Sequence, residues 1–276
     1  MTATTHDPIT GALPPYRQPQ RVTQLRVMRA EWTKLRTQPS AYWALLSTVI
    51  LVVGFGIGYS LLRVARPPHG AAIASFDPAA ISLSGVQLAQ IAVGVLGVLL
   101  ITSEYATGLI RTTFAAAPRR LPVLWGKAAV LAAAITAVSL PAAFAAFASG
   151  QSILSRQHLS VPLSQPGVAR AVIGCALYLA VVGLLGLGLG AVIRSAAGGI
   201  AALFGLLYGL PLAASFLPGS MAADVTKYLP ASAGQAVTTV QPDPTMLQPW
   251  IGFSVLCAYA AVLLAISAAR MRRGDA

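Results

Sequence analysis

The sequence predicts an all-α membrane protein with six transmembrane helices. Of its 276 residues, 56% are hydrophobic and only 9% are charged, whereas a soluble domain carries about 25% charged residues. Six apolar runs are each long enough to cross about 30 Å of hydrocarbon as a helix. The charges lie between these runs, so the net charge of +12 suits anionic lipid headgroups and gives no reason to expect nucleic acid as a partner.

The first 20 residues contain four prolines and few apolar residues. Such a segment cannot bury enough surface to fold, so residues 1–20 are predicted to be a disordered cytoplasmic tail. The first apolar run starts near Ala41 and is too long for the core of a signal peptide. We therefore expect the first span to stay in the membrane as an uncleaved anchor.

Residues 21–37 are predicted to form an amphipathic helix that lies flat at the inner leaflet. Its apolar residues recur at helical spacing and include Trp32, which is expected at headgroup depth. Arg29 and Arg36 lie along one border of this stripe, whereas Glu31 and Lys34 lie away from it. The alternative is a soluble helix docked on a protein partner. In either case, the proline at position 39 is expected to end the helix.

The six spans are predicted within a transmembrane domain covering residues 41–270. Pro141 predicts a kink or tilt in the third span. Three GxxxG pairs could let helices approach closely: Gly54 with Gly58, Gly186 with Gly190, and Gly205 with Gly209. The predicted spans are 41–62, 80–103, 124–150, 171–193, 197–216 and 250–269.

The distribution of lysine and arginine predicts the topology. With the N-terminus inside, the cytoplasmic segments carry 14 basic residues and the outer segments carry 5. This bias follows the positive-inside rule, and an even number of spans places both termini in the cytoplasm of a cell membrane. The outer segment 217–249 holds five prolines, so we expect short helices near 225–229 and 234–240, or an irregular loop.

The chain shows no means of powering uphill transport by itself. When Lys127 is counted with the connection before the third span, no charged residue or histidine falls inside the spans, which disfavours an ion-coupled carrier. There is also no GxxxxGK[ST] phosphate loop. We therefore expect no enzyme activity, catalytic residue, cofactor or metal, and the energy must come from a separate protein.

Residues 100–127 are where such a partner would act. Ser103 can cap a short helix whose N-terminal end favours Glu104. Tyr105 and Leu109 can share one side of that helix, and Gly108 allows a bend or the close approach of a partner backbone. The alternative is an ordinary polar loop with positive charges.

Three segments resemble the ABC-2 type permeases, which are membrane subunits of ATP-binding cassette exporters. They are residues 31–36 (EWTKLR), residues 103–111 (SEYATGLIR) and residues 117–120 (APRR). The resemblance covers almost the whole chain after the tail, and the Glu-Tyr-x-x-Gly-x-x-Arg run after the second span is its most specific part.

This resemblance implies a connecting helix at residues 21–37 and a coupling helix at residues 104–111, where an ATPase subunit docks. It also implies a dimer of permeases, like or unlike, with two copies of the ATPase, and small outer helices between the last two spans. The connecting helix would use Arg29, Trp32, Lys34 and Arg36. The docking residues would be Glu104, Tyr105, Thr107, Gly108, Leu109 and Arg111.

Two other functions remain open from the sequence. One is a membrane scaffold or sensor without transport activity, whose basic segments bind lipid or a regulatory protein. The other is a secondary carrier that uses the glutamines and hydroxyl groups of the spans. The sequence leaves the exported substrate undefined.

Overall fold

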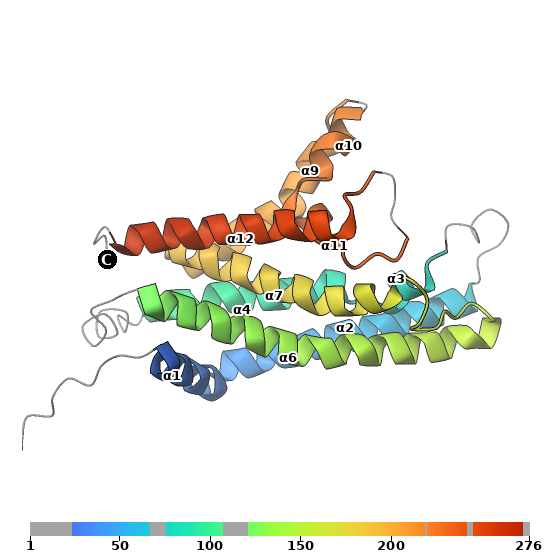
Figure 1. Ribbon diagram of the computed structural model, residues 1–276, viewed down its shortest axis with the longest axis horizontal. Helices are drawn as coiled ribbons and strands as arrows, with labels where there is room; N and C mark the ends of the chain where they lie inside the picture. Colours follow the sequence, from blue (N-terminus) through green and yellow to red (C-terminus); the bar gives the residue numbers. More distant parts are fainter. Residues whose placement is uncertain (1–23, 67–75, 107–120, 219, 242–244, 273–276) are drawn as a thin grey trace, which may run out of the picture.

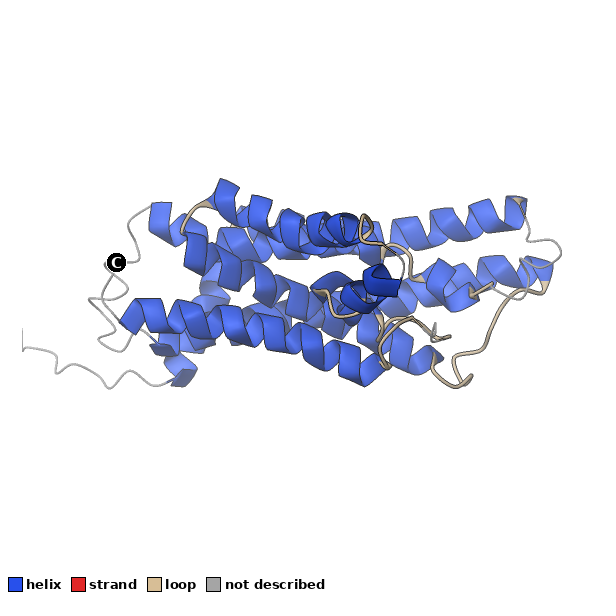
Figure 2. Ribbon diagram, turned by 90° about the horizontal axis from the view of Figure 1, so that it is seen from above, coloured by secondary structure: helices blue, strands red, loops and turns tan. Residues whose placement is uncertain are grey.

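A computed structural model describes residues 24–66, 76–106, 121–218, 220–241 and 245–272. Within these ranges the protein is all-helical and has no strand. Six of the described helical segments are long and apolar enough to cross a membrane, so the predicted class and number of spans are confirmed. The long helices lie side by side along one axis, as Figures 1 and 2 show.

The chain enters the bundle through a sharp bend between its first two helices. Helix α1 (Gln24–Thr37) crosses the end of the bundle, and α2 (Pro39–Ala65) runs away from it along the long axis (Figure 1). Gln38 between them is extended, with φ −90° and ψ 113°, because a residue before proline disfavours the α conformation. Pro39 then opens α2 at a position where its missing N–H costs nothing.

The second predicted span is divided in two, which corrects the expectation of one continuous helix. Helix α3 (Pro78–Ser82) is capped by the Asp77 carboxylate, and α4 (Val86–Ala106) starts after a turn. Gly85 in this turn lies against α2, where an added Cβ would be 2.2 Å from the Leu51 carbonyl oxygen. Only glycine allows the two backbones to come this close.

Two long helices follow. Helix α6 (Leu121–Leu154), which continues into a short 3-10 turn η2 (Ser155–Gln157), passes through Pro141 as one element. Helix α7 (Val168–Ile193) is the most buried of the membrane-spanning helices and packs against α4, α6 and the last helix. It therefore forms the centre of the described bundle.

One of the three predicted glycine pairs packs helices together inside the chain. A Cβ on Gly186 would lie 2.1 Å from the Gly94 oxygen, so α7 and α4 touch backbone to backbone. Gly190 faces α4 in the same seam. The other two predicted pairs, on α2 and on the fifth span, have no atom within 4 Å of an added Cβ, and they line open surface instead.

The fifth span is irregular. It consists of α8 (Ala196–Phe204), a π-helical turn η3 (Gly205–Gly209) and α9 (Leu210–Ala214). Pro211 has no N–H to donate to the oxygen of Leu207, and its ring crowds that carbonyl. The wider π turn just before the proline relieves this conflict. From there, α9 and α10 (Ser220–Thr226) rise obliquely away from the bundle (Figure 1).

The chain then returns to the bundle. Helix α11 (Pro230–Gln235) packs against α7 and α12 (Pro249–Arg272). The two short helices α10 and α11 each lie several residues earlier than the predicted pair. Helix α12 ends at the same end of the bundle as α1, on the far side of the helices between them, so both ends of the described chain lie at this end (Figure 1). We call this the α1 end.

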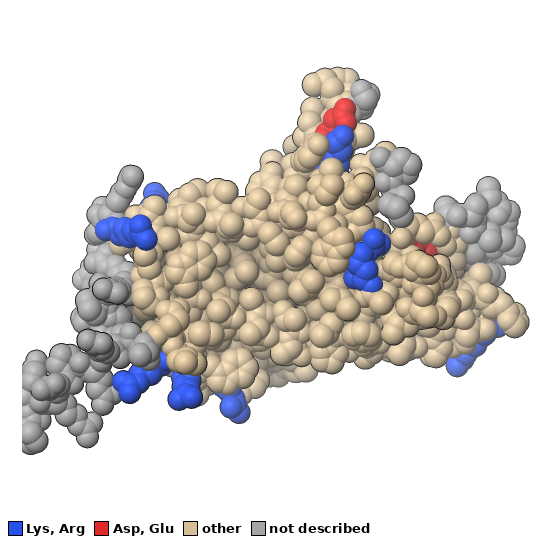
Figure 3. Space-filling view, viewed as in Figure 1, with Lys and Arg blue, Asp and Glu red and all other residues tan. Residues whose placement is uncertain are grey.

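Charge is sparse along the sides of the bundle. On the face shown in Figure 3, lysines and arginines gather at the α1 end and at a few places toward the other end, and the broad middle is uncharged. Large apolar side chains are exposed on α2 and α12, such as Trp43 at 71% and Val262 at 56%. This surface fits contact with lipid tails.

Candidate functional site

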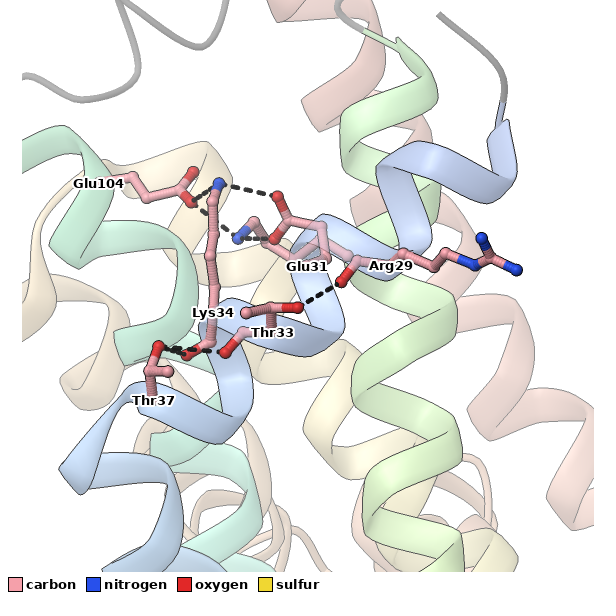
Figure 4. A network of polar contacts seen from close by, with 7 residues as sticks. Arg29, Glu31, Thr33, Lys34, Thr37 and Glu104 are labelled. Carbon is pink, nitrogen blue, oxygen red and sulfur yellow. Dashed lines mark hydrogen bonds and ion pairs between the residues drawn. The ribbon is translucent and has the colours of Figure 1, made fainter.

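Four charged side chains form a closed cluster at the α1 end. We call it the ion quartet: Glu31, Lys34, Glu104 and Lys127. Each lysine bridges both glutamates. The Lys127 ammonium lies 2.6 Å from Glu31 Oε2 and 2.9 Å from Glu104 Oε1. Lys34 lies 2.8 Å from Glu31 Oε1 and 3.1 Å from Glu104 Oε1. Figure 4 shows Glu31, Lys34 and Glu104 converging.

Three of the four members are withdrawn from solvent. The side-chain exposure is 1% for Lys127, 4% for Glu31 and 11% for Glu104, while Lys34 remains 44% exposed. Desolvating a charge is costly, and such a cluster is tolerated only when every charge is paired at short range. Two carboxylates and two ammonium groups balance, so the quartet is neutral as a whole.

The pKa values of the two members on α1 respond to this pairing. Burial alone would raise the pKa of Glu31, but the charge of Lys127 and hydrogen bonds from both lysines outweigh burial and hold that pKa below its ordinary value. Burial alone would lower the pKa of Lys34, but its contacts with Glu31 and Glu104 raise it. Both groups therefore stay charged at neutral pH.

Three segments that are distant in sequence supply the quartet. Glu31 and Lys34 come from α1, Glu104 from the last turn of α4, and Lys127 from the second turn of α6. Gly126 makes the approach possible, because a Cβ there would lie 3.0 Å from the Val27 side chain of α1. The quartet thus fastens α1 to both helices that border residues 107–120.

The structure corrects two expectations here. The sequence interpretation placed Glu31 away from the apolar stripe of the first helix, but Glu31 points into the bundle and is buried with Leu35. It also counted Lys127 with a connection and found no charge inside the spans, but Lys127 is part of α6 and is fully buried. The stripe itself is divided, because Trp32 stays 42% exposed.

Apart from Tyr105, the predicted site residues separate into three groups. Glu104 and Lys34 are in the ion quartet. The other residues predicted on the connecting helix (Arg29, Trp32 and Arg36) are exposed, and Figure 4 shows Arg29 pointing away from the cluster. Four docking residues lie outside the described residues: Thr107, Gly108, Leu109 and Arg111.

Tyr105 is held by the end of α7. The guanidinium of Arg194 lies 5.5 Å from the centre of the Tyr105 ring, a distance at which a cation is attracted to the ring face. Arg194 ends α7 in a left-handed conformation with φ 61°. The last turn of α4 is therefore fixed on two sides, by α1 through Glu104 and by the α7 end through Tyr105.

A pocket of about 270 Å³ opens beside the quartet. It includes the exposed part of Lys34 and reaches the buried Lys127, so it connects the cluster with the surface at the bend between α1 and α2. Its lining consists of Lys34, Thr37, Gln38, Leu100, Ser103, Glu104 and Lys127.

Sequence reasoning missed Glu31 and Lys127 as members of one site. A signal was present, because a lysine four residues into an apolar run must pair when it is buried. The two candidate partners, Glu31 and Glu104, lie 96 and 23 residues away, and nothing local selects between them. The structure shows that Lys127 binds both.

The quartet positions the helices that it joins. Its members neutralise one another, and within the described residues no three histidine, cysteine, aspartate or glutamate side chains gather as metal ligands. No protein-family model matches this chain, and a search of curated proteins finds no relative.

Proposed function

We propose that this protein is the membrane-spanning permease subunit of an ABC-2 type exporter, driven by a separate ATPase subunit that docks on residues 104–111. The observation that carries the proposal is the ion quartet. Both helices that flank residues 107–120 are fastened to α1 by Glu104 and Lys127. A pull on this connection therefore reaches α1 and, through the bend at Gln38, the first span.

The quartet gives this proposal a mechanical basis. Nucleotide binding would close two ATPase subunits and draw the two copies of the connection together. Because α4, α6 and α1 are joined at this end, they would move as one body. Shifting a two-state equilibrium from 1:99 to 99:1 takes about 5.5 kcal/mol of differential binding. Separating these helices would leave the buried charges of the quartet unpaired, which is costly.

A second permease is part of the proposal. Helix α2 and the fifth span are the least buried of the six membrane-spanning helices. Each carries a glycine pair with no atom within 4 Å of an added Cβ: Gly54 with Gly58 and Gly205 with Gly209. Open glycine pairs on poorly covered helices fit packing against another subunit. The exported substrate would pass between the two permeases.

A secondary carrier is the alternative function, because ionisable groups do occur inside the membrane helices. Lys127 lies about 9 Å from the start of α6, and Glu104 lies two residues before the end of α4. A carrier usually keeps its coupling group near the bilayer midplane beside a cavity. The quartet is at one end and fully paired, so the permease is the better supported function.

Photo-crosslinking from Leu109 tests the proposal. A crosslinking amino acid at this position in whole cells is expected to capture a protein that has a phosphate loop and hydrolyses ATP. The matched control places the same amino acid at Ser164, an exposed residue predicted on the outer side, and should not capture it. Capture of a protein without a phosphate loop would favour the scaffold or sensor instead.

A substitution in the connection separates docking from coupling. In the purified complex, Gly108→Pro is expected to change the rate of ATP hydrolysis, because it stiffens the segment that the ATPase grips. An unchanged rate of hydrolysis and of coupled transport would show that the partner does not use this segment.

A further inference from the structure

A second polar cluster runs from the interior of the bundle to its surface and contains no charge. We call it the polar network: Gln87, Gln90, Tyr178, Tyr208 and Gln235. Gln90 donates to the Tyr208 hydroxyl at 2.8 Å and accepts from the Tyr178 hydroxyl. The Tyr208 hydroxyl donates to the main-chain oxygen of Gln87 at 3.0 Å. The side-chain amide of Gln235 donates to Gln87 Oε1 at 2.8 Å.

The network lies at membrane depth. Gln90 is 14 residues before Glu104 on α4, which places it about 21 Å along the helix from the ion quartet. The hydrocarbon core is about 30 Å thick. If the quartet marks one boundary of that core, then Gln90 lies about two thirds of the way across it.

The inner half of the network is structural. Tyr178 is fully buried on α7, and Gln90 is 1% exposed. Their hydrogen bond joins two packed helices, as polar pairs commonly do inside membrane proteins. Gly234 of α11 lies on the Tyr178 ring, where an added Cβ would be 2.6 Å from Cε2. This half needs no ligand to explain it.

The outer half of the network is different, because it reaches the surface. Gln87 is exposed and Tyr208 is 40% exposed. A polar group that faces lipid tails loses the hydrogen bonds that water would supply. The Tyr208 hydroxyl is already bonded to Gln87 and Gln90, but the side-chain N–H groups of Gln87 donate to none of the described residues. These exposed N–H groups therefore point to a polar neighbour other than lipid.

The π-helical turn brings Tyr208 to this place. Tyr208 sits in η3, and such turns are frequent at functional sites. Its ring also stacks on Phe204 with centroids 5.9 Å apart. The seam between α4 and η3 thus offers hydrogen-bonding groups from Gln87 and Tyr208 next to an aromatic, apolar wall.

We propose that this seam between α4 and η3 binds a neutral amphiphile that carries hydroxyl or amide groups on an apolar body. The polar head meets Gln87, Tyr208 and Gln235, and the body lies along Phe204. The network holds no charged side chain, so an ionic headgroup would enter without a counter-ion, which is costly at this depth. The proposal rests on the proposed function in one respect, since only an exporter would carry the bound amphiphile across the membrane.

Titration of labelled amphiphiles into the full protein in lipid nanodiscs tests the site. The probes share one fluorescent alkyl chain and carry a glucosyl, a phosphate or a trimethylammonium head. We expect the glucosyl probe to bind most tightly. Tyr208→Phe and Gln87→Leu should each weaken its binding between about twofold and tenfold, the range expected for one lost hydrogen bond. Tyr42→Phe, on an exposed tyrosine of α2 (58%), is the matched control and should bind as the wild type does.

Three results would overturn the site. One is equal binding of all three probes to the wild type, and another is unchanged binding of the glucosyl probe to both variants. The third is a disulfide between two copies of Gln87→Cys in nanodiscs, which would show that a second copy covers the seam. Failure of the Leu109 crosslink alone would remove the ATPase and leave this binding result standing, so the two proposals fail separately.

Discussion

At the scale of single residues, Lys127 is the most consequential side chain in the chain. It is 1% exposed and contacts a carboxylate from α1 and another from α4. Its aliphatic stem suits the bundle interior, but its charge is tolerated only with both partners present. Removing it leaves two glutamates facing each other with only the half-exposed Lys34 between them.

Lys127→Met is expected to destabilise the protein by about 3–5 kcal/mol, the usual cost of breaking a buried ion pair from one side. Adding Glu31→Leu should restore most of the loss, since Glu104 and Lys34 then remain as a balanced pair. Thermal unfolding of the purified variants measures both effects. Lys227→Met, in an exposed pair with Asp224, is the control and should unfold as the wild type does. Additive losses in the double variant would contradict a shared cluster.

Glu31 also predicts a dependence of stability on pH. Its folded pKa is lowered, so its contribution to stability is complete above the ordinary glutamate pKa of about 4.3. That contribution is lost as the pH falls through the folded pKa, because the unfolded chain binds the proton more readily. The unfolding temperature of the wild type should therefore drop more steeply below about pH 4.3 than that of Glu31→Gln. Equal acid sensitivity would mean that Glu31 is not paired as described.

At the scale of elements, glycines decide which helices touch. The sequence contains three equivalent GxxxG pairs, and only the pair on α7 packs against another helix within the described residues. The pattern alone could not distinguish them, because an open pair and a packed pair look the same without knowing the neighbouring helix. The division of the second span at Gly85 was missed for the same reason: it depends on contact with α2.

Gly186→Ala tests the α4–α7 seam. The added methyl group would lie 2.1 Å from the Gly94 oxygen, so the helices must separate at a cost of about 1–3 kcal/mol. The control is Val262→Ala at an exposed position of α12, which should be neutral or stabilise by up to about 0.7 kcal/mol through helix propensity. Thermal unfolding in detergent compares them. A wild-type melting temperature for Gly186→Ala would refute the close approach.

The first helix shows what periodicity can and cannot predict. Its existence and its end near Pro39 are predicted from spacing and from proline chemistry, and the structure has a helix from Gln24 to Thr37. The predicted orientation of this helix was wrong at Glu31, because a prediction from the hydrophobic stripe places a carboxylate on the polar side. Only the partner on α6 explains why this carboxylate turns inward, and no local pattern reveals such a partner.

At the scale of the whole molecule, the class and the six spans followed from composition and run length, and the described helices confirm both. The ion quartet could not be derived in this way. It joins residues 31, 34, 104 and 127, and each of these charges has an ordinary local explanation as part of a basic or polar segment. Their convergence is a property of the packed bundle.

The orientation of the bundle is the claim on which the proposed function depends most. ATP is available to a partner only on the cytoplasmic side, so the α1 end, with the ion quartet and the connection that starts after Ala106, must face the cytoplasm. The positive-inside bias predicts this orientation. The half-buried Cys257 and the buried Cys175 lie within spans. A cysteine introduced outside the spans is therefore the thiol that a water-soluble reagent is expected to label.

Sided labelling of single introduced cysteines in sealed cells measures the orientation directly. With a membrane-impermeant maleimide outside, Ser164→Cys should react at once, and Gly108→Cys should react only after the membrane is opened. Labelling of Gly108→Cys in sealed cells, with Ser164→Cys protected, would place the connection outside and contradict an ATP-driven permease.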